Sequence, residues 1–127
     1  MALQRDRKSR DYLYGRLLSI ADDLEKWALS SANEKRSTNA QRLMQRFADR
    51  PFNTYRSIEM ALAPYKQRLG GKAGKYYHEI ENIMNLFEAE EFVDDSPLSG
   101  EFLLGYYCQH NYFMEEAKRN NGQKEDE

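Results

Sequence analysis

The 127-residue sequence is poor in residues that cross-link chains, break helices or bind metals: it holds one cysteine, two histidines, three prolines and seven glycines. A single cysteine cannot form an internal disulfide, and a chain of this length buries about two-thirds of its unfolded surface without one. Residues 1–10 are basic and polar and lack the apolar segment of a signal peptide, and no apolar run is long enough to cross a membrane. We therefore expect a cytoplasmic protein with one domain over residues 1–121 and a flexible acidic tail over residues 122–127.

The motifs of the common enzyme and metal sites are also missing. Cys108 and His110 are two residues apart and would point to opposite sides of a helix, so they cannot form a thiolate–imidazole pair. There is no CxxC, HExxH or Glu-x-x-His pattern, and the acidic run over residues 88–95 lacks the spacing of a calcium loop. The sequence predicts no catalytic residue, metal site or cofactor.

The glycine-rich segment "GGKAGK", residues 70–75, invites comparison with a phosphate-binding loop. A Walker loop lies between a strand and a helix and ends in Lys followed by Ser or Thr. Here a helical pattern precedes the segment, and Tyr76 stands where the hydroxyl that binds Mg²⁺ should be. A flexible hinge that carries two lysines is the better interpretation.

Apolar residues recur at spacings of three and four, which is typical of helices that bury one face. The clearest stripe is Leu13, Leu17, Ile20, Leu24 and Trp27. Pro51 suits the first turn of a helix, and Gly70 suits the end of one. The sequence predicts an all-α fold, an antiparallel bundle of about five helices over residues 9–30, 39–49, 52–69, 75–91 and from 96 or 99 to 120.

The last of these helices is apolar most of the way round. Phe102, Tyr106 and Phe113 share one face, and Leu103, Tyr107 and Met114 occupy the next. A helix of this kind is expected in the centre of a bundle, where neighbours cover several sides. Gly105 would let another backbone approach closely.

Charge is divided unevenly along the chain, although the net charge is only −2. Residues 1–75 hold 16 Lys and Arg against 8 Asp and Glu, whereas residues 76–127 hold 3 against 13. This asymmetry predicts a basic face toward a polyanion and an acidic face turned elsewhere, although uneven charge on a solvated surface would look similar. The candidate nucleic-acid-binding residues are Arg42, Arg46, Arg50, Arg56, Lys66, Arg68, Lys72, Lys75, Arg16, Arg10, Lys8 and Arg7.

Three long strings resemble one known family. They are "RDYLYGRLLSIADDLEKWA" (residues 10–28), "RPFNTYRSIEMALAPYKQRL" (residues 50–69) and "PLSGEFLLGYYCQ" (residues 97–109). In this order and spacing they are similar to the C-terminal helical region of the large subunit of type I-C CRISPR effector complexes (Cascade), over roughly residues 8–118.

The resemblance implies a function and a set of partners. In that family an internal start within the large-subunit gene also yields a separate small subunit, and a 127-residue chain that begins just ahead of the first family helix looks like it. Such a subunit lines the complex in more than one copy, against the backbone subunits, the large subunit and the crRNA. It helps to hold the opened target DNA, especially the displaced non-target strand, whereas guide pairing reads the sequence. The large subunit's parts for recognising foreign DNA are absent.

Two other classes of function remain open. A helical adaptor that contacts only proteins, with its acidic half docking basic partners, would suit a net charge near zero, since free DNA-binding proteins are usually strongly basic. A small enzyme is the third class, and no catalytic constellation in the sequence favours it.

Overall fold

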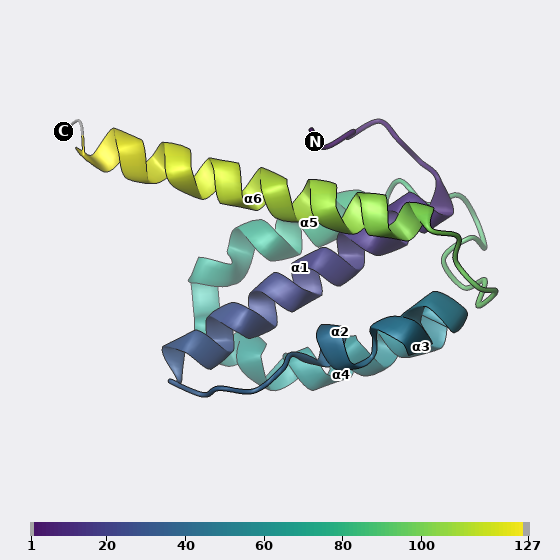
Figure 1. The fold of residues 1–127 in the computed structure, drawn as a ribbon, viewed down its shortest axis with the longest axis horizontal. Helices are drawn as coiled ribbons and strands as arrows, with labels where there is room; N and C mark the ends of the chain where they lie inside the picture. Colours follow the sequence, from purple (N-terminus) through teal and green to yellow (C-terminus); the bar gives the residue numbers. More distant parts are fainter. Residues whose placement is uncertain (1, 126–127) are drawn as a thin grey trace.

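The computed structural model describes residues 2–125, with only the backbone described at Lys72 and residues 121–125. This part of the chain contains six α-helices, one short 3-10 helix and no strand, which confirms the all-α prediction (Figure 1). The side chains of the acidic tail predicted over residues 122–127 lie outside the described residues. At residues 126–127 the backbone lies outside them too. The elements are α1 (Arg10–Ser31), α2 (Asn39–Arg42), α3 (Met44–Asp49), α4 (Pro51–Leu69), η1 (Gly70–Ala73), α5 (Gly74–Met84) and α6 (Glu101–Glu125).

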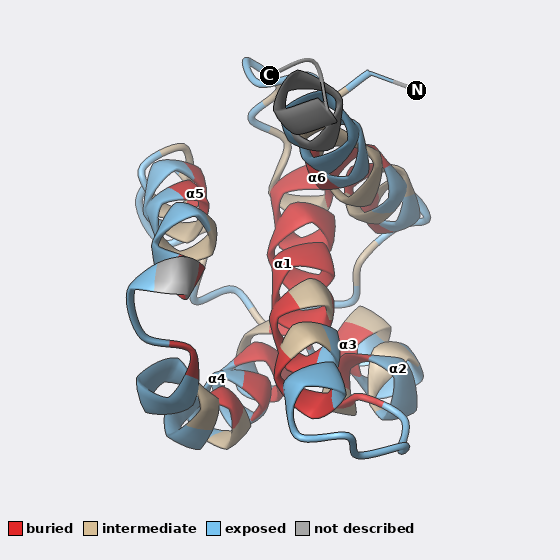
Figure 2. Cartoon of the chain, turned by 90° about the vertical axis from the view of Figure 1, so that its left-hand side faces the viewer, coloured by how far each residue is buried: buried red, intermediate tan, exposed pale blue. Residues whose placement is uncertain are grey.

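The central helix is α1, not the last helix. Fifteen of its 22 residues are buried, and it packs against α6, α4, α5 and α2 (Figure 2). In contrast, α6 packs mainly against α1 and leaves Leu103, Tyr107 and Met114 between 38% and 51% exposed. The expectation of a central last helix was wrong because apolarity around a helix does not show how many neighbours cover it.

A pair of glycines fixes how α1 and α6 cross. A Cβ atom added to Gly15 would lie 1.8 Å from the carbonyl oxygen of Phe102, and one added to Gly105 would lie 2.1 Å from that of Tyr12. The two backbones therefore touch directly, as the sequence predicted for Gly105. The two helices run in the same general direction in Figure 1, so this pair does not follow the antiparallel arrangement expected of a simple bundle.

The helix predicted over residues 39–49 is split in two. Thr38 caps α2 by accepting a hydrogen bond from the backbone N–H of Gln41 at 3.1 Å, and Leu43 leaves helical geometry with φ −104° and ψ 11°. The chain then turns at Arg50, and Pro51 occupies the first turn of α4, where its missing N–H has no helical partner to lose. This break accounts for six α-helices where five were expected.

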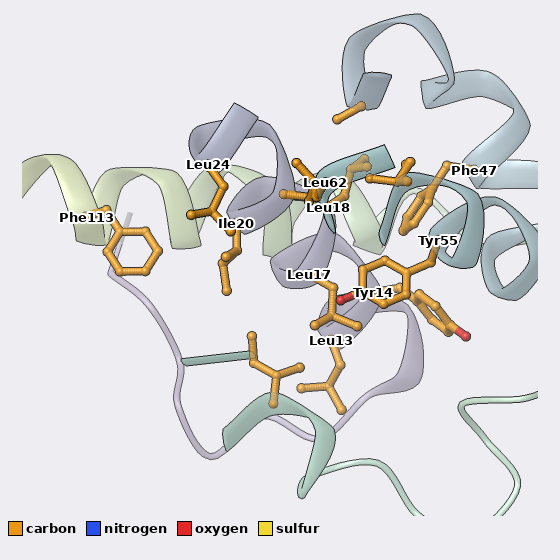
Figure 3. Packing of buried hydrophobic residues seen from close by; sticks show 14 of the residues in the cluster. Leu13, Tyr14, Leu17, Leu18, Ile20, Leu24, Phe47, Tyr55, Leu62 and Phe113 are labelled. Carbon is orange, nitrogen blue, oxygen red and sulfur yellow. The ribbon is translucent and has the colours of Figure 1, made fainter. Parts of the chain in front are cut away.

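The helix predicted over residues 75–91 ends early, at Met84. Residues 85–100 form turns and extended segments without a helix. Their aromatic side chains still enter the core, since the ring of Phe92 stacks on Tyr14 and meets Phe87 edge-on. The surrounding core joins α1 to α3 and α4 through Leu17, Leu18, Phe47, Tyr55 and Leu62 (Figure 3).

Candidate nucleic-acid interface

Two of the predicted arginines, Arg46 and Arg50, flank a hollow between α3 and α4. The hollow has a volume of about 250 Å³, and its other walls are the polar side chains of Asn53, Thr54 and Ser57. The Arg50 side chain is 70% exposed. The hollow thus presents two guanidinium groups and the polar side chains of Asn53 and Ser57 to solvent, a set suited to contacting phosphate oxygens.

The other two predicted arginines of this region are also exposed. Arg42 ends α2, where its guanidinium donates to the side-chain oxygen of Asn39. The Arg56 guanidinium lies over the ring of Phe52, 5.6 Å from its centroid. The four arginines therefore leave their charge accessible on α2, α3 and α4.

A second basic group lies where α4 turns through η1 into α5, and we call Lys66, Arg68 and Lys75 the elbow cations. All three are exposed, and each lies over an aromatic ring: Lys66 over Tyr77 at 4.9 Å, Arg68 over Tyr65 at 5.5 Å and Lys75 over Tyr76 at 5.3 Å. The Lys72 side chain lies outside the described residues. Alternating cations and aromatic rings are typical of surfaces that bind single strands.

Sequence reasoning missed the contacts between these rings and the cations. Only the dipeptide Lys75–Tyr76 gave a local signal, because Lys66 lies over Tyr77, eleven positions later, and Arg68 lies over Tyr65.

Arg16 is not part of any surface, which corrects its assignment to the interface. Its side chain is 1% exposed and forms an ion pair with Glu79 at 2.8 Å, while its Nε donates to Gln109 at 2.8 Å. Burial lowers the pKa of Arg16, although the nearby Glu79 carboxylate opposes that shift. This arginine joins α1, α5 and α6 from inside.

Most of the basic residues of the N-terminal arm, which we define as residues 5–10, also form contacts within the protein. Arg7 pairs with Glu101 at 2.9 Å, and Arg5 pairs with Glu79 at 2.9 Å. Arg10, whose side chain is 12% exposed, pairs with Asp11 and donates to the backbone oxygen of Asp94 at 2.8 Å. Lys8 is exposed and is the one predicted residue of this arm for which the described residues show no ion pair.

The acidic segment over residues 88–95 reaches the basic surface at its end and so is not confined to an opposite face. Asp95 accepts hydrogen bonds from the backbone N–H groups of Phe52 and Asn53 at 3.0 and 3.2 Å, and so caps α4. The same carboxylate is 3.7 Å from Arg50. Acidic and basic groups therefore meet at the start of α4, which limits the separation of charge.

The Cys108 and His110 side chains do not meet. Cys108 is buried, and His110 Nδ1 lies 3.0 Å from Asp23 on α1. Within the described residues, no three His, Cys, Asp or Glu side chains are grouped so that they could hold a metal ion. None of the helices in that part of the chain combines the length and the apolarity needed to cross a membrane.

The fold and the surface together define a small all-α protein with two accessible groups of cations, one on α2–α4 and one at the elbow. A family model described as "CRISPR-associated protein (Cas_Csd1)" matches residues 1–114. The chain belongs to this family of type I-C CRISPR-associated proteins. No curated protein and no solved structure matches the chain.

Proposed function

We propose that this protein is a non-catalytic small subunit of a type I-C CRISPR effector complex, where it stabilises target DNA opened by the guide RNA. Its main ligand is the displaced non-target strand. Basic side chains contact the phosphates of this strand and do not read its base sequence. Its partners are the large subunit, the backbone subunits that hold the crRNA and other copies of the chain, in the cytoplasm.

The observation that carries the proposal is the hollow flanked by Arg46 and Arg50, together with the elbow cations. Both groups are exposed, whereas Arg16, Arg7 and Arg10 are held in ion pairs within the protein. Arg50 lies 3.7 Å from Asp95 but keeps 70% of its side chain exposed. A subunit with a net charge of −2 binds free DNA weakly, so we expect its contribution inside an assembly that positions it.

The test reverses Arg42, Arg46 and Arg50 to Glu and measures the assembled complex on fully opened target DNA. Each phosphate contact on a single strand contributes a salt slope of about −0.7, so losing three contacts should flatten the slope by about two units. The displaced strand should become more reactive to permanganate. Solvent-facing substitutions usually change stability by about 0.5 kcal/mol or less, so folding and assembly should be retained.

The matched control reverses Lys35, Lys118 and Arg119 to Glu. These residues are also exposed, and the change in net charge is the same, but they lie outside both basic groups. If the two triple variants protect the displaced strand equally well, the arginines of α2–α4 are only a solvated face. Nanomolar, sequence-selective binding by the free protein, or a nuclease activity, would contradict the proposal as a whole.

An adaptor that contacts only proteins is the second candidate, and one observation favours it. Leu103, Tyr107 and Met114 form an apolar stripe on the outer side of α6 that stays exposed among the described residues. Unchanged DNA protection in both triple variants, combined with loss of assembly when this stripe is made polar, would support the adaptor.

A further inference from the structure

The segment that joins α4 to α5 is rich in glycine that packing does not require. Gly70, Gly71 and Gly74 are three of its five residues, and a Cβ atom added at any of them would meet nothing within 4 Å. Gly70 has a φ of 58°, which favours glycine, but Gly71 and Gly74 do not have a positive φ. What glycine supplies at these two positions is backbone freedom. This is the segment for which the sequence predicts a flexible hinge.

One face of α5 is open toward α4. Helix α5 lies beside α1 (Figure 2), and of its 11 residues only Glu79 and Ile83 are buried. A cleft of about 410 Å³ separates α5 from α4. Its lining includes one cation and one carboxylate and is otherwise apolar or aromatic, with Tyr55 and Leu62 on α4 and Tyr77 and Ile80 on α5. Contact between these two walls would remove apolar surface from water, so the hydrophobic effect favours closing the cleft.

A buried ion pair opposes this closure by holding α5 on α1. Glu79 Oε1 accepts hydrogen bonds from Arg16 Nη2 at 2.8 Å and from Arg5 Nη1 at 2.9 Å. The Arg16 side chain is 1% exposed, and its Nη1 has no hydrogen-bond partner among the described residues. Glu79 thus supplies the negative charge that the buried guanidinium needs. If Glu79 moved away, the charge of Arg16 would stay in the interior without a partner, which is strongly unfavourable.

Arg16 and Arg5 cannot follow α5 toward α4, because both also contact α6. Arg16 Nε donates to Gln109 on α6 at 2.8 Å, and the Arg5 guanidinium lies 4.5 Å from the centroid of the Tyr112 ring on the same helix. The ion pair therefore holds α5 toward α6, whereas the cleft lies on its side toward α4. Helix α5 can keep the ion pair or close the cleft, and one excludes the other.

We propose that α5 is a hinged flap that turns about residues 70–74, and that the ion pair between Glu79 and Arg16 holds it open. Loss of the charge on Glu79 lets α5 turn toward α4 and close the cleft. The elbow cations lie on both sides of this hinge, Lys66 and Arg68 on α4 and Lys75 on α5, so closure changes the spacing of that basic group. The inference concerns the chain by itself and does not rest on the proposed function.

Disulfide trapping in the full chain measures how readily α5 approaches α4. Cys108, the one cysteine of the sequence, is buried and is replaced by alanine. The substitutions Ala63→Cys and Ile80→Cys then place one thiol on each wall of the cleft, and this protein is the parent for all comparisons. Two cysteines form a disulfide only when their Cα atoms come within about 7 Å. The rate of oxidation therefore reports closure.

Glu79→Gln removes the charge that holds α5 and keeps the size of the side chain. We expect this variant to form the disulfide at least about tenfold faster than the parent, because losing a buried ion pair changes an equilibrium by that factor or more. Glu81→Gln is the matched control, since Glu81 is exposed on the same helix and the described residues show no ion pair for it. Its rate should equal that of the parent. Circular dichroism at 222 nm checks that both variants are folded.

A variant of the hinge tests the same motion without touching the ion pair, so the result does not depend on Glu79→Gln folding. Gly71→Ala combined with Gly74→Ala fits the observed structure, because neither new Cβ atom would meet a neighbour. Alanine restricts the backbone at both positions, so the parent carrying this double change should form the disulfide about fourfold more slowly or less readily still.

Three outcomes would overturn the flap. Equal rates for the parent and a folded Glu79→Gln protein would show that the ion pair does not hold α5. An unchanged rate in the double alanine variant would show that α5 does not turn about residues 70–74. Hydrogen exchange of the unmodified protein separates turning from local unfolding, because a helix that turns as a unit keeps the amides of residues 78–84 protected. Fast exchange of all these amides would show that α5 melts instead.

Discussion

Replacing Gly105 by alanine tests the crossing of α1 and α6, because helix propensity predicts a gain in the free energy of unfolding and packing predicts a loss. Alanine in a helix interior is more favourable than glycine by about 1 kcal/mol, so propensity alone predicts a more stable protein. The structure predicts a clash, since the new Cβ would lie 2.1 Å from the Tyr12 oxygen and 3.2 Å from the Arg16 nitrogen, both backbone atoms.

The magnitude follows from how far the helices must separate. An ordinary contact of a Cβ atom begins at 3.4 Å, so the crossing must open by more than an ångström at Tyr12. Overpacking of a core usually destabilises by about 1–3 kcal/mol, and a rigid backbone places this case at or above the upper end. After the gain in propensity, we expect a net loss of about 2 kcal/mol or more, which corresponds to a drop in Tm of roughly 6–8 °C.

The assay is thermal and urea denaturation followed by circular dichroism at 222 nm. Gly74→Ala is the control, because Gly74 begins α5 with φ −54°, and a Cβ there would meet nothing within 4 Å. We expect the control to be neutral or slightly stabilised. A Gly105→Ala protein as stable as the control would refute the close crossing, and Gly15→Ala should repeat the loss from the opposite side.

Three further predictions concern the core, a helix cap and alkaline pH. Phe102→Ala should destabilise by about 3–5 kcal/mol in urea melts, whereas Leu103→Ala, at a 38% exposed position, should lose less than about 1 kcal/mol; equal losses would contradict the orientation of α6. Asp95→Ala should lower stability by about 1 kcal/mol through the cap of α4, and Glu90→Ala should not; matching effects would argue against the cap. Burial raises the pKa values of Tyr14, Tyr55 and Tyr106 above the ordinary 10.0, so the stability that these neutral phenols contribute is present below pH 10 and is lost as the pH rises beyond it. Absorbance at 295 nm should show these tyrosines ionising together with unfolding, and gradual ionisation in the folded state would contradict their burial.

The helical boundaries that depend on local chemistry could be predicted from the sequence. The expected start and end of α1 differ from the observed ones by one residue, and Pro51 and Gly70 mark the two ends of α4 closely. These signals act within one or two turns, so a single segment contains all the information. Where a helix ended without such a signal, as at Met84, apolar spacing alone carried the expected helix too far.

The arrangement of the helices could not be predicted in this way, and neither could the burial of particular charged side chains. Arg16 lies on the buried side of α1 because Glu79, 63 positions later, neutralises it. Asp22 is buried for a similar reason, since it accepts hydrogen bonds from Thr38 and from Tyr106, 84 positions away. Partners so distant in sequence give no periodic signal, so these charges looked like ordinary surface residues.

The sequence predicted which basic residues form the candidate surface on α2–α4 and at the elbow, but not how these residues are arranged. The arginines of α2–α4 and the elbow cations are exposed, but Arg42, Arg46 and Arg50 do not lie on one helix, because the chain breaks at Leu43 and turns at Arg50. Whether these residues contact DNA stays a prediction. The cleft of about 410 Å³ between α4 and α5, which Lys66 lines, was not foreseeable, because side chains from α1, α4 and α5 together form its walls.

The pairing of α1 with α6 also sets the order in which the protein can fold during synthesis. Helix α1 is synthesised before α6, and its contact surface for α6 has no partner until residues after 101 have been added. At about 5–20 residues per second, the intervening stretch of roughly 70 residues takes about 4–14 s to make. Throughout that interval the side of α1 around Gly15 remains open to chaperones and to other nascent chains. The close crossing can therefore form only after α6 has been made, and until then this apolar side of α1 is the kind of exposed surface that makes a partly folded chain prone to aggregate.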